Sequence, residues 1–565
     1  MNKELKNKLI ELQAMPRLER IKKTNEFLEV KPGPLRELSP WWWWKWSCRV
    51  SVLIVVDGLD YNPLDGFGLT EFVKIFEEIQ NQSLTNIEYR VTLAHTSDLS
   101  GGDPTYDINN DIRMFASYSF IHQRIHQFDF ASSVNLNTFD QVWIFGVGSS
   151  GSISSNEISA INNYMNNGGG LFATGDHGSL GKRLCGNIDR VKDMRLWDST
   201  SSNNDSDEVS MTGRRRNDTN RPGAGQAVST AFENQSDDIP QNIAVRTFGN
   251  GLPHPLLSIP TSIRPSGIID IMPDHPHEGE CTNERFFTVT NPVTNNSESI
   301  RSQIIATSFV LGGSTSGGKS PTDPHCFPSI SVFDGRPANV GRIVVDSTWH
   351  HFVNINLDGT GSGGQTGLNN SDFEVIKKYF KNIATWISRR KFMLCWFKFI
   401  WAELINNSQL IESSLNEPEL PFEKIQPDDL YSIGKLAQEI ISNKLSPSFA
   451  YEFMCEMIRP VNPDIADDLN IWKPKFKGDR SDQNAFNRWL DMDKMIGIAV
   501  GSGFIALRDN LERIQNEKED SFDKIDNIFF EGVDKGFQLS LKLMDRDMGR
   551  FKRTMKKGIS NRTLK

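Results

Sequence analysis

The sequence predicts an α/β protein with a flavodoxin-like parallel sheet, helices on both faces of that sheet, and an all-helical C-terminal region. Three observations predict this class: a β-branched run beginning at Arg49, a strand, helix, strand pattern over residues 139–174, and helical periodicity beyond residue 372. A strand, helix, strand order implies a right-handed crossover, which makes the two strands parallel.

The first strand and helix are predicted from burial patterns. "RVSVLIVVDG" is a β-branched run that ends in Asp57-Gly58, as a strand buried on both faces should look. The apolar residues that follow recur at helical spacing, and "EYRVTLAH" is then typical of a second strand. The helical set is Phe72, Val73, Ile75, Phe76 and Ile79.

The next elements have clear start and stop signals. "FDQVWIFGVG" at 139–148 predicts a strand that ends in a glycine turn. Ser154 and Glu157 form a capping-box signature for a helix, which the glycines at 168–170 should end. "LFAT" follows directly and predicts the parallel partner strand.

Composition and length limit the class of protein. The chain has 565 residues, enough for two or three domains, with 38% hydrophobic and 24% charged residues. Its net charge of −9 argues against a nucleic-acid partner. The apolar stretches 392–405 and 495–507 are too short to span a membrane, and six scattered cysteines suit a reducing compartment. We therefore expect a cytoplasmic protein without a membrane partner.

Changes in composition predict the domain boundaries. Residues 1–48 are expected to be a helical, Trp-rich lead-in, and residues 49–357 the α/β domain, with a polar insertion at 195–250. The Gly-rich segment 358–372 has the composition of a linker. Residues 373–565 are then expected to form a helical domain.

In parallel sheets of this kind, ligands bind beyond the carboxyl ends of the strands. Asp57, Gly148 and the Asp176-His177 pair all follow predicted strands directly. These residues should therefore lie along one edge of the sheet.

Three short stretches in this order resemble ThuA-like proteins, which belong to the class I glutamine amidotransferase-like superfold. They are "GGGLFATGDHGS" at 168–179, "HPLLSIPTSIRP" from His254, and "GRIVVDSTWHH", which ends in two histidines. The resemblance implies that His177 sits in the turn over the sheet, with His350 at the end of the closing strand. Amidotransferases carry a nucleophilic Cys in that turn, whereas here Cys185 lies eight residues beyond His177. A cysteine-nucleophile mechanism therefore has little support.

Most of the histidines occur in Gly/Pro-rich loops or at strand ends, next to acids. Such groups could transfer protons or bind a divalent metal, zinc being the candidate, or they could simply cap loops. The candidate catalytic residues are Asp176, His177, Asp346 and His350; the candidate ligand-binding residues are Asp57, Gly148, His275, His277 and His351; the candidate metal ligands are His177, His275, His277 and His350.

Two further motifs have weaker support. "HPHEGEC" and "DPHCF" supply Cys281, Cys326 and histidines, but only folding could bring them together as a zinc site. "GSTSGGKS" at 313–320 matches the phosphate-loop pattern, although three prolines follow where that site needs a helix.

Two classes of function remain open from the sequence. One is a hydrolase that acts on a small or nucleotide-like substrate through the His/Asp cluster. The alternative is a non-catalytic ligand-sensing or effector subunit of a bacterial defence or signalling complex, whose helical domain binds a protein partner.

Overall fold

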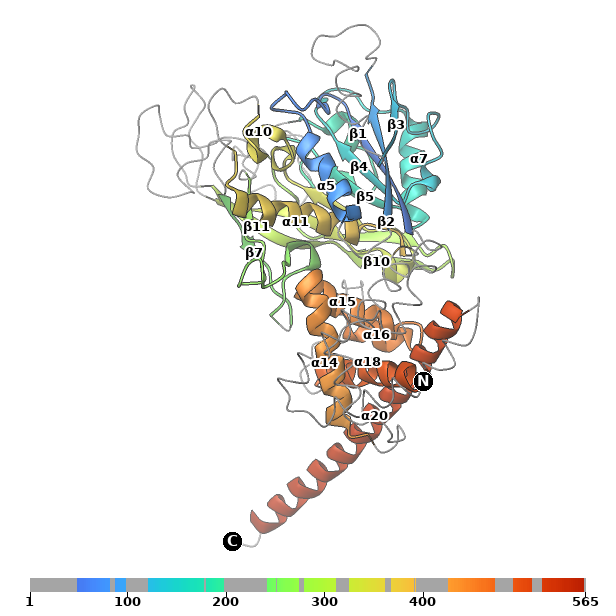
Figure 1. The fold of residues 1–565 in the computed structure, drawn as a ribbon. Helices are drawn as coiled ribbons and strands as arrows, with labels where there is room; N and C mark the ends of the chain where they lie inside the picture. Colours follow the sequence, from blue (N-terminus) through green and yellow to red (C-terminus); the bar gives the residue numbers. More distant parts are fainter. Residues whose placement is uncertain are drawn as a thin grey trace, which may run out of the picture. The chain divides into compact units, whose positions relative to one another are not determined.

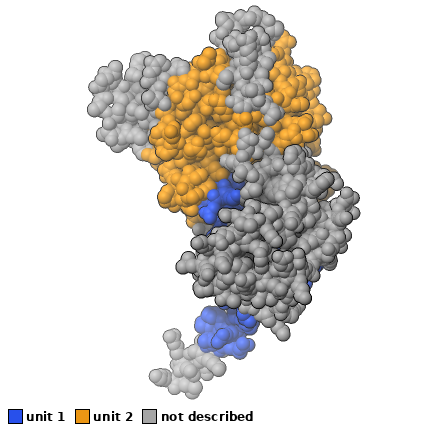
Figure 2. Space-filling view, in the orientation of Figure 1, with its two compact units in different colours: residues 1–46, 397–471, 481–565 blue, residues 47–396, 472–480 orange. Residues whose placement is uncertain are grey.

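The chain divides into two compact units, which Figure 2 colours separately. Unit 1 comprises Met1–Trp46, Phe397–Ile471 and Ser481–Lys565; unit 2 comprises Ser47–Trp396 and Trp472–Arg480. The computed structural model describes residues 48–81, 87–97, 120–176, 179–197, 241–249, 251–273, 279–310, 325–360, 367–390, 392, 425–472, 491–510 and 521–562. The expected lead-in at 1–47, most of the polar insertion and the phosphate-loop pattern lie outside these residues.

Unit 2 is an α/β unit built on a nine-stranded sheet of order β3-β2-β1-β4-β5-β13-β12-β11-β7 (Figure 1). Neighbouring strands from β3 to β13 run parallel, as predicted. The strands are β1 (Cys48–Val56), β2 (Ile87–His95), β3 (Ile121–Ile125), β4 (Gln141–Phe145), β5 (Gly170–Thr174), β7 (Ala244–Val245), β11 (Gln303–Val310), β12 (His325–Phe333) and β13 (Ile343–Asp346).

The expectation of a wholly parallel sheet is wrong at one end. β12 is antiparallel to both β13 and β11, and β7 is antiparallel to β11. The chain from Phe333 to Ile343 is too short to cross over the sheet, because parallel neighbours need a connection of about a dozen residues or more. The sheet is therefore mixed.

Helices cover both faces of the sheet, as predicted. On β4, Trp143 and Phe145 point to the face that carries α5 (Thr70–Asn81) and α11 (Asn370–Trp386), where both rings contact Phe72. Val142 and Ile144 belong instead to the core formed with α7 (Ser155–Asn166). The alternation along one strand thus directs its side chains into two separate layers of the core.

The predicted local signals hold at α7. The hydroxyl of Ser154 accepts the backbone N–H of Glu157 at 3.3 Å, and the Glu157 carboxylate accepts the Ser154 N–H at 2.8 Å. Gly168, at φ +81°, follows the end of the helix. The predicted apolar face of α5 is buried along its length.

The remaining elements of unit 2 are short. A hairpin pairs β9 with β10, and a small ladder pairs β6 with β8. Their bounds, with those of the short helices, are β6 (Gln241–Asn242), β8 (Ile271–Met272), β9 (Phe286–Thr290), β10 (Ser297–Arg301), α8 (Lys182–Cys185), α10 (Asn354–Leu357), η1 (Leu136–Thr138), η2 (Val191–Asp193), η3 (Pro255–Leu257), η5 (Arg336–Ala338) and η6 (Trp349–His351).

Unit 1 is helical in its described residues, and α18 forms its centre. α18 contacts α14 and α20, and it contains the apolar stretch 495–507, which is mostly buried. A Cβ on Gly434 would lie 2.0 Å from the Gly497 carbonyl oxygen, so the glycines let α14 and α18 cross closely. The helices are α14 (Pro427–Lys444), α15 (Pro447–Ile458), α16 (Pro463–Leu469), α18 (Met492–Asp509) and α20 (Ser521–Arg562).

Within the described residues, no helix combines the length and apolarity that crossing a membrane requires. Nearly all of the stretch 392–405 lies outside these residues. The boundary between the units falls after Trp396 rather than in the expected linker at 358–372. The reason is α11, whose Phe380 packs against Phe72 of α5 and keeps this helix with the sheet.

Candidate active site at the ends of the parallel strands

Register places the ends of four strands at one edge of the sheet. Val56 pairs with Phe145, Phe145 with Thr174, and Thr174 with Asp346. Because these strands are parallel, the residues that follow them emerge at the same edge. This edge therefore receives the segments that begin at Asp57, Gly146, Gly175 and Ser347.

Asp57 and Gly148, two predicted ligand-binding residues, contact each other. The Asp57 carboxylate accepts backbone N–H groups from Val147 and Gly148, the latter at 3.1 and 3.2 Å to its two oxygens. Burial raises the pKa of Asp57, against the lowering effect of these N–H groups and of Arg183. The carboxylate thus holds the loop that follows β4.

The glycines of the turn after β5 serve close packing. A Cβ on Gly181, which has φ +93°, would lie 2.8 Å from the Cα of Gly175, and a Cβ on Gly146 would lie 2.6 Å from the Cα of Gly181. The turn therefore folds back onto the ends of β4 and β5. Asp176 N–H donates to the Leu180 carbonyl at 3.2 Å, which closes the turn before α8. His177 lies outside the described residues.

Asp176 and His350, both predicted as catalytic, meet across neighbouring strand ends. His350 Nε2 lies 3.5 Å from Asp176 Oδ2, and the Thr348 hydroxyl donates to Asp176 Oδ1 at 3.3 Å. The same Thr348 oxygen accepts the backbone N–H of His350 at 3.1 Å, as the N-cap of η6. We call Asp176 and His350 the outer pair.

Aromatic rings surround the His350 imidazole. Trp349 stacks on it with centroids 4.4 Å apart, and Phe67 meets it edge-on at 6.2 Å. Phe67 is 45% exposed, so the outer pair lies beside the surface although His350 itself is buried. Asn356 Nδ2 lies 3.4 Å from His350 Nδ1, which favours a neutral imidazole that carries its hydrogen on Nε2.

Asp346 and His351 form a second pair, the inner pair, on the other side of the same turn. His351 Nδ1 lies 2.8 Å from Asp346 Oδ1, and the Tyr379 hydroxyl donates to Asp346 Oδ2 at 2.7 Å. Burial and the neighbouring Asp346 raise the pKa of Tyr379 well above its usual value. All three side chains are buried, so the inner pair joins the sheet to α11.

Arg195 joins the two turns that carry the outer pair. Its Nη2 donates to the carbonyls of Asp176 and Ser347, both at 2.7 Å, and its Nε also donates to Ser347 at 2.9 Å. The guanidinium is fully buried over Trp197, and burial lowers the pKa of Arg195. The sequence analysis missed Arg195 because it assigned residue 195 to the polar insertion. The apolar pair Leu196-Trp197 that follows was the available signal of a buried segment.

The described cysteines are not placed as nucleophiles or zinc ligands. Cys185 and Cys281 are buried, and burial raises the pKa of both thiols. The Cys281 thiol donates to the Ser329 carbonyl at 3.4 Å within the core, whereas Cys326 is exposed.

His275 and His277 lie outside the described residues, as does His177, so most of the predicted metal set is not placed. Among the residues that are described, no group of three or more His, Cys, Asp or Glu side chains could hold a metal ion.

Comparisons with known proteins add little to this geometry. No family model matches the chain, and no curated protein matches it in sequence. Among solved structures it is similar to a ThuA-like protein from Bacteroides uniformis, at 11% identity and a TM-score of 0.23, over 59% of this chain and 92% of the other. At that score, the likeness transfers neither fold nor activity to this chain.

The outer pair has the composition of an acid–base site. A carboxylate that contacts an imidazole can orient the ring and stabilise its charged form, while the imidazole exchanges protons near neutral pH. The inner pair contains the same two groups but is enclosed by Tyr379 and the sheet. Of the predicted catalytic residues, the structure thus brings Asp176 and His350 into contact, while the Asp346 carboxylate contacts His351 and Tyr379.

Proposed function

We propose that this chain is a hydrolase in which Asp176 and His350 act as an acid–base pair on a small or nucleotide-like substrate. The observation that carries the proposal is the 3.5 Å contact between Asp176 Oδ2 and His350 Nε2 at the carboxyl edge of the parallel strands. Ligands of such sheets bind at that edge.

In the proposed reaction, water is the nucleophile. His350 accepts a proton at Nδ1, where water takes the place of the Asn356 amide and attacks the substrate, and Asp176 stabilises the imidazolium that forms. His350 then returns the proton to the leaving group. Thr348 and Arg195 keep the two turns in place through their contacts with Asp176 and Ser347. The raised pKa of the Cys185 thiol supports a route through water rather than through a thiolate.

The surroundings of the pair support a small, flat substrate. Phe67, which is 45% exposed, offers aromatic surface next to His350, on which a nucleobase or a similar ring can stack. We further propose that the sheet is flavodoxin-like with β3 as an added edge strand. Without β3, the parallel strands have the order β2-β1-β4-β5-β13, which is the 2-1-3-4-5 order of that class. We propose a cytoplasmic site of action.

One observation favours the alternative, a non-catalytic subunit that senses a ligand for a bacterial defence or signalling complex. Both nitrogens of His350 have polar neighbours within the chain, Asp176 and Asn356, which suits a ring held for binding. In that alternative, the helical unit binds the protein partner.

Hydrolysis of two model substrates, p-nitrophenyl acetate and bis(p-nitrophenyl) phosphate, tests the proposal. We expect His350→Gln to lower the wild-type rate by about 10²-fold or more, the usual contribution of a general acid–base group. His122→Gln, at an exposed position of β3, is the matched control and should keep the wild-type rate.

A His350→Gln protein that hydrolyses at the wild-type rate would overturn the catalytic role. If bis(p-nitrophenyl) phosphate binds without being hydrolysed, and His350→Gln abolishes that binding, the result would instead support the ligand-sensing alternative.

A further inference from the structure

The long helix α20 carries one apolar stripe along its length, of which only the first part is covered. Phe529 contacts Phe504 of α18 with ring centroids 5.7 Å apart, and Val533 and Phe537 are buried as well. Beyond Ser540 the stripe continues but is exposed: Leu541 is 47% exposed and Phe551 60%. A run of large apolar side chains open to water indicates an interaction surface.

The exposed part has coiled-coil spacing. Leu541, Met544, Met548, Phe551 and Met555 follow one another at intervals of three, four, three and four residues. This is the a/d pattern of two heptads, with a period of 3.5 residues, which keeps a seam facing a parallel partner helix. Met548 and Met555 are each 51% exposed and Met544 is half-buried, so most of the seam is open.

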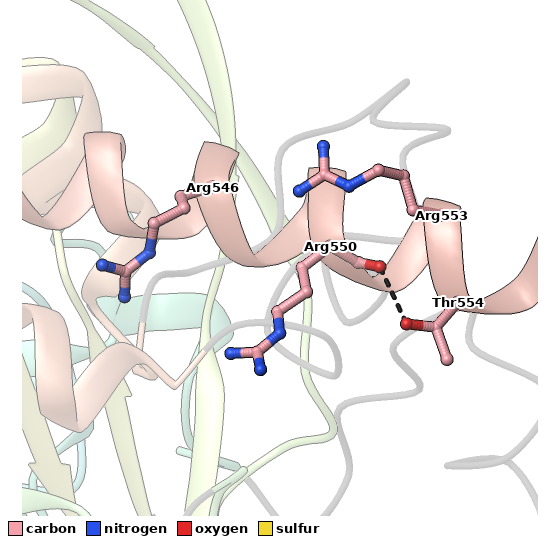
Figure 3. A pocket seen from close by; sticks show the side chains of 4 residues that line it. All are labelled: Arg546, Arg550, Arg553 and Thr554. Atoms are coloured by element: carbon pink, nitrogen blue, oxygen red, sulfur yellow. Dashed lines mark hydrogen bonds between the residues drawn. The ribbon is translucent and has the colours of Figure 1, made fainter.

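Basic residues occupy the positions that point away from this seam. Arg546, Arg550 and Arg553 take outer heptad positions, and together with Thr554 they line an open cavity on that side of α20 (Figure 3). The Thr554 hydroxyl donates to the Arg550 carbonyl at 3.1 Å, and the three arginine side chains extend away from the helix (Figure 3). A partner on the seam would thus leave these charges in water.

The residues that flank the seam select the partner. Asp547 lies at a g position and Lys552 at the following e position, the two positions that meet across a parallel two-stranded coiled coil. In a pair of identical helices, each Asp547 would face the other copy's Lys552. The other g and e positions of the seam are Ser540 and Asp545. They would meet across the dimer without bringing two like charges together.

We propose that a second copy of this chain covers the stripe, through a parallel coiled coil over Leu541–Met555. An anionic membrane suits the surface less well, because Asp545 and Asp547 border the apolar stripe on its two sides. Two heptads form a small interface, so the dimer is expected to be concentration-dependent.

Sedimentation velocity of the full chain tests this proposal. At about 100 µM, a concentration that populates a micromolar dimer, the mass should move from 63.9 kDa toward twice that value. Met548→Asp with Phe551→Asp should keep the protein monomeric, with an unchanged far-ultraviolet circular dichroism spectrum. Arg553→Gln, which alters an outer position, is the matched control and should dimerise like the wild type.

A charge swap identifies the partner as a second copy in the stated register. Asp547→Lys alone should weaken association about threefold or more, and Asp547→Lys with Lys552→Asp should restore it. A wild-type monomer at all concentrations would overturn the proposal, as would a dimer that survives the seam substitutions. Monomers that bind phosphatidylserine vesicles through the stripe would overturn it in favour of a membrane.

Discussion

The turn after β13 carries two adjacent histidines that meet two different acids. His350 contacts Asp176, which follows the neighbouring strand β5, whereas His351 contacts Asp346 at the end of its own strand. The contacts of Asp176 to His350 and Thr348 are 3.5 and 3.3 Å. Those of Asp346 to His351 and Tyr379 are 2.8 and 2.7 Å.

This difference separates a pair that supports the fold from the pair that we propose acts on a ligand. The inner pair is enclosed between the sheet and α11, where the Tyr379 hydroxyl satisfies Asp346 Oδ2 through a short hydrogen bond. The outer pair has looser contacts and lies beside the exposed ring of Phe67. Functional sites commonly have weaker contacts than the core, because the arrangement that activity requires is often less stable than the best-packed one.

The largest effect should come from the inner pair. Asp346→Asn takes the charged acceptor away from the Tyr379 hydroxyl in a buried site, and we expect a loss of about 3 kcal/mol in the free energy of unfolding. Urea denaturation followed by tryptophan fluorescence measures it. Tyr379→Phe removes one hydrogen bond only and should cost about 1 kcal/mol. A loss below 1 kcal/mol for Asp346→Asn would show that the inner pair contributes little to the stability of the fold.

A buried histidine whose strongest charged neighbour is Arg342 rather than an acid sharpens the comparison through pH. His254 accepts the Leu256 N–H at 3.3 Å and packs against Trp386; burial, with the nearby Arg342 and Arg246, lowers its pKa from 6.5 to about 3. Between those values the unfolded chain binds the extra proton, so stability is lost as the pH falls.

At pH 4 we expect the loss from His254 to be roughly 3 kcal/mol, since one pKa unit corresponds to about 1.4 kcal/mol. His254→Asn keeps an N-cap acceptor and cannot titrate, so its unfolding free energy should fall less steeply between pH 6.5 and 4. Equal slopes for both proteins, measured by urea denaturation at each pH, would contradict the assignment.

Arg195 holds together the two turns that carry the outer pair. Replacing it should therefore lower the free energy of unfolding by an intermediate amount. Arg195→Met leaves the buried carbonyls of Asp176 and Ser347 without their donor, at a cost of about 2–3 kcal/mol. Arg195→Lys keeps the charge and should recover part of that loss. Denaturation curves of the three proteins check the order, and a Met variant as stable as the wild type would contradict it.

The sequence was sufficient for what depends on local pattern. Val142 and Trp143 alternate between two buried faces, and Ser154 caps its helix, so both features could be predicted from neighbouring residues. The predicted parallel strand ends likewise place Asp176 and His350 at the same edge of the sheet.

Features that depend on long-range packing could not be predicted. Nothing in "DSTWHH" says that η6 directs His350 toward β5 and His351 toward Asp346, and Arg195 binds Ser347 from 152 residues away in the chain. The antiparallel end of the sheet is likewise set by pairing between distant segments.

The unfolding free energies of Asp176→Asn and Asp346→Asn, measured side by side, test most directly whether the outer pair is the functional one. The two substitutions are the same change in shape and charge at two buried carboxylates. We predict that Asp176→Asn changes stability by less than about 1 kcal/mol in either direction, or increases it, while Asp346→Asn costs several times more. An Asp176→Asn protein that loses as much stability as Asp346→Asn would show that the outer pair is also structural and would contradict the account.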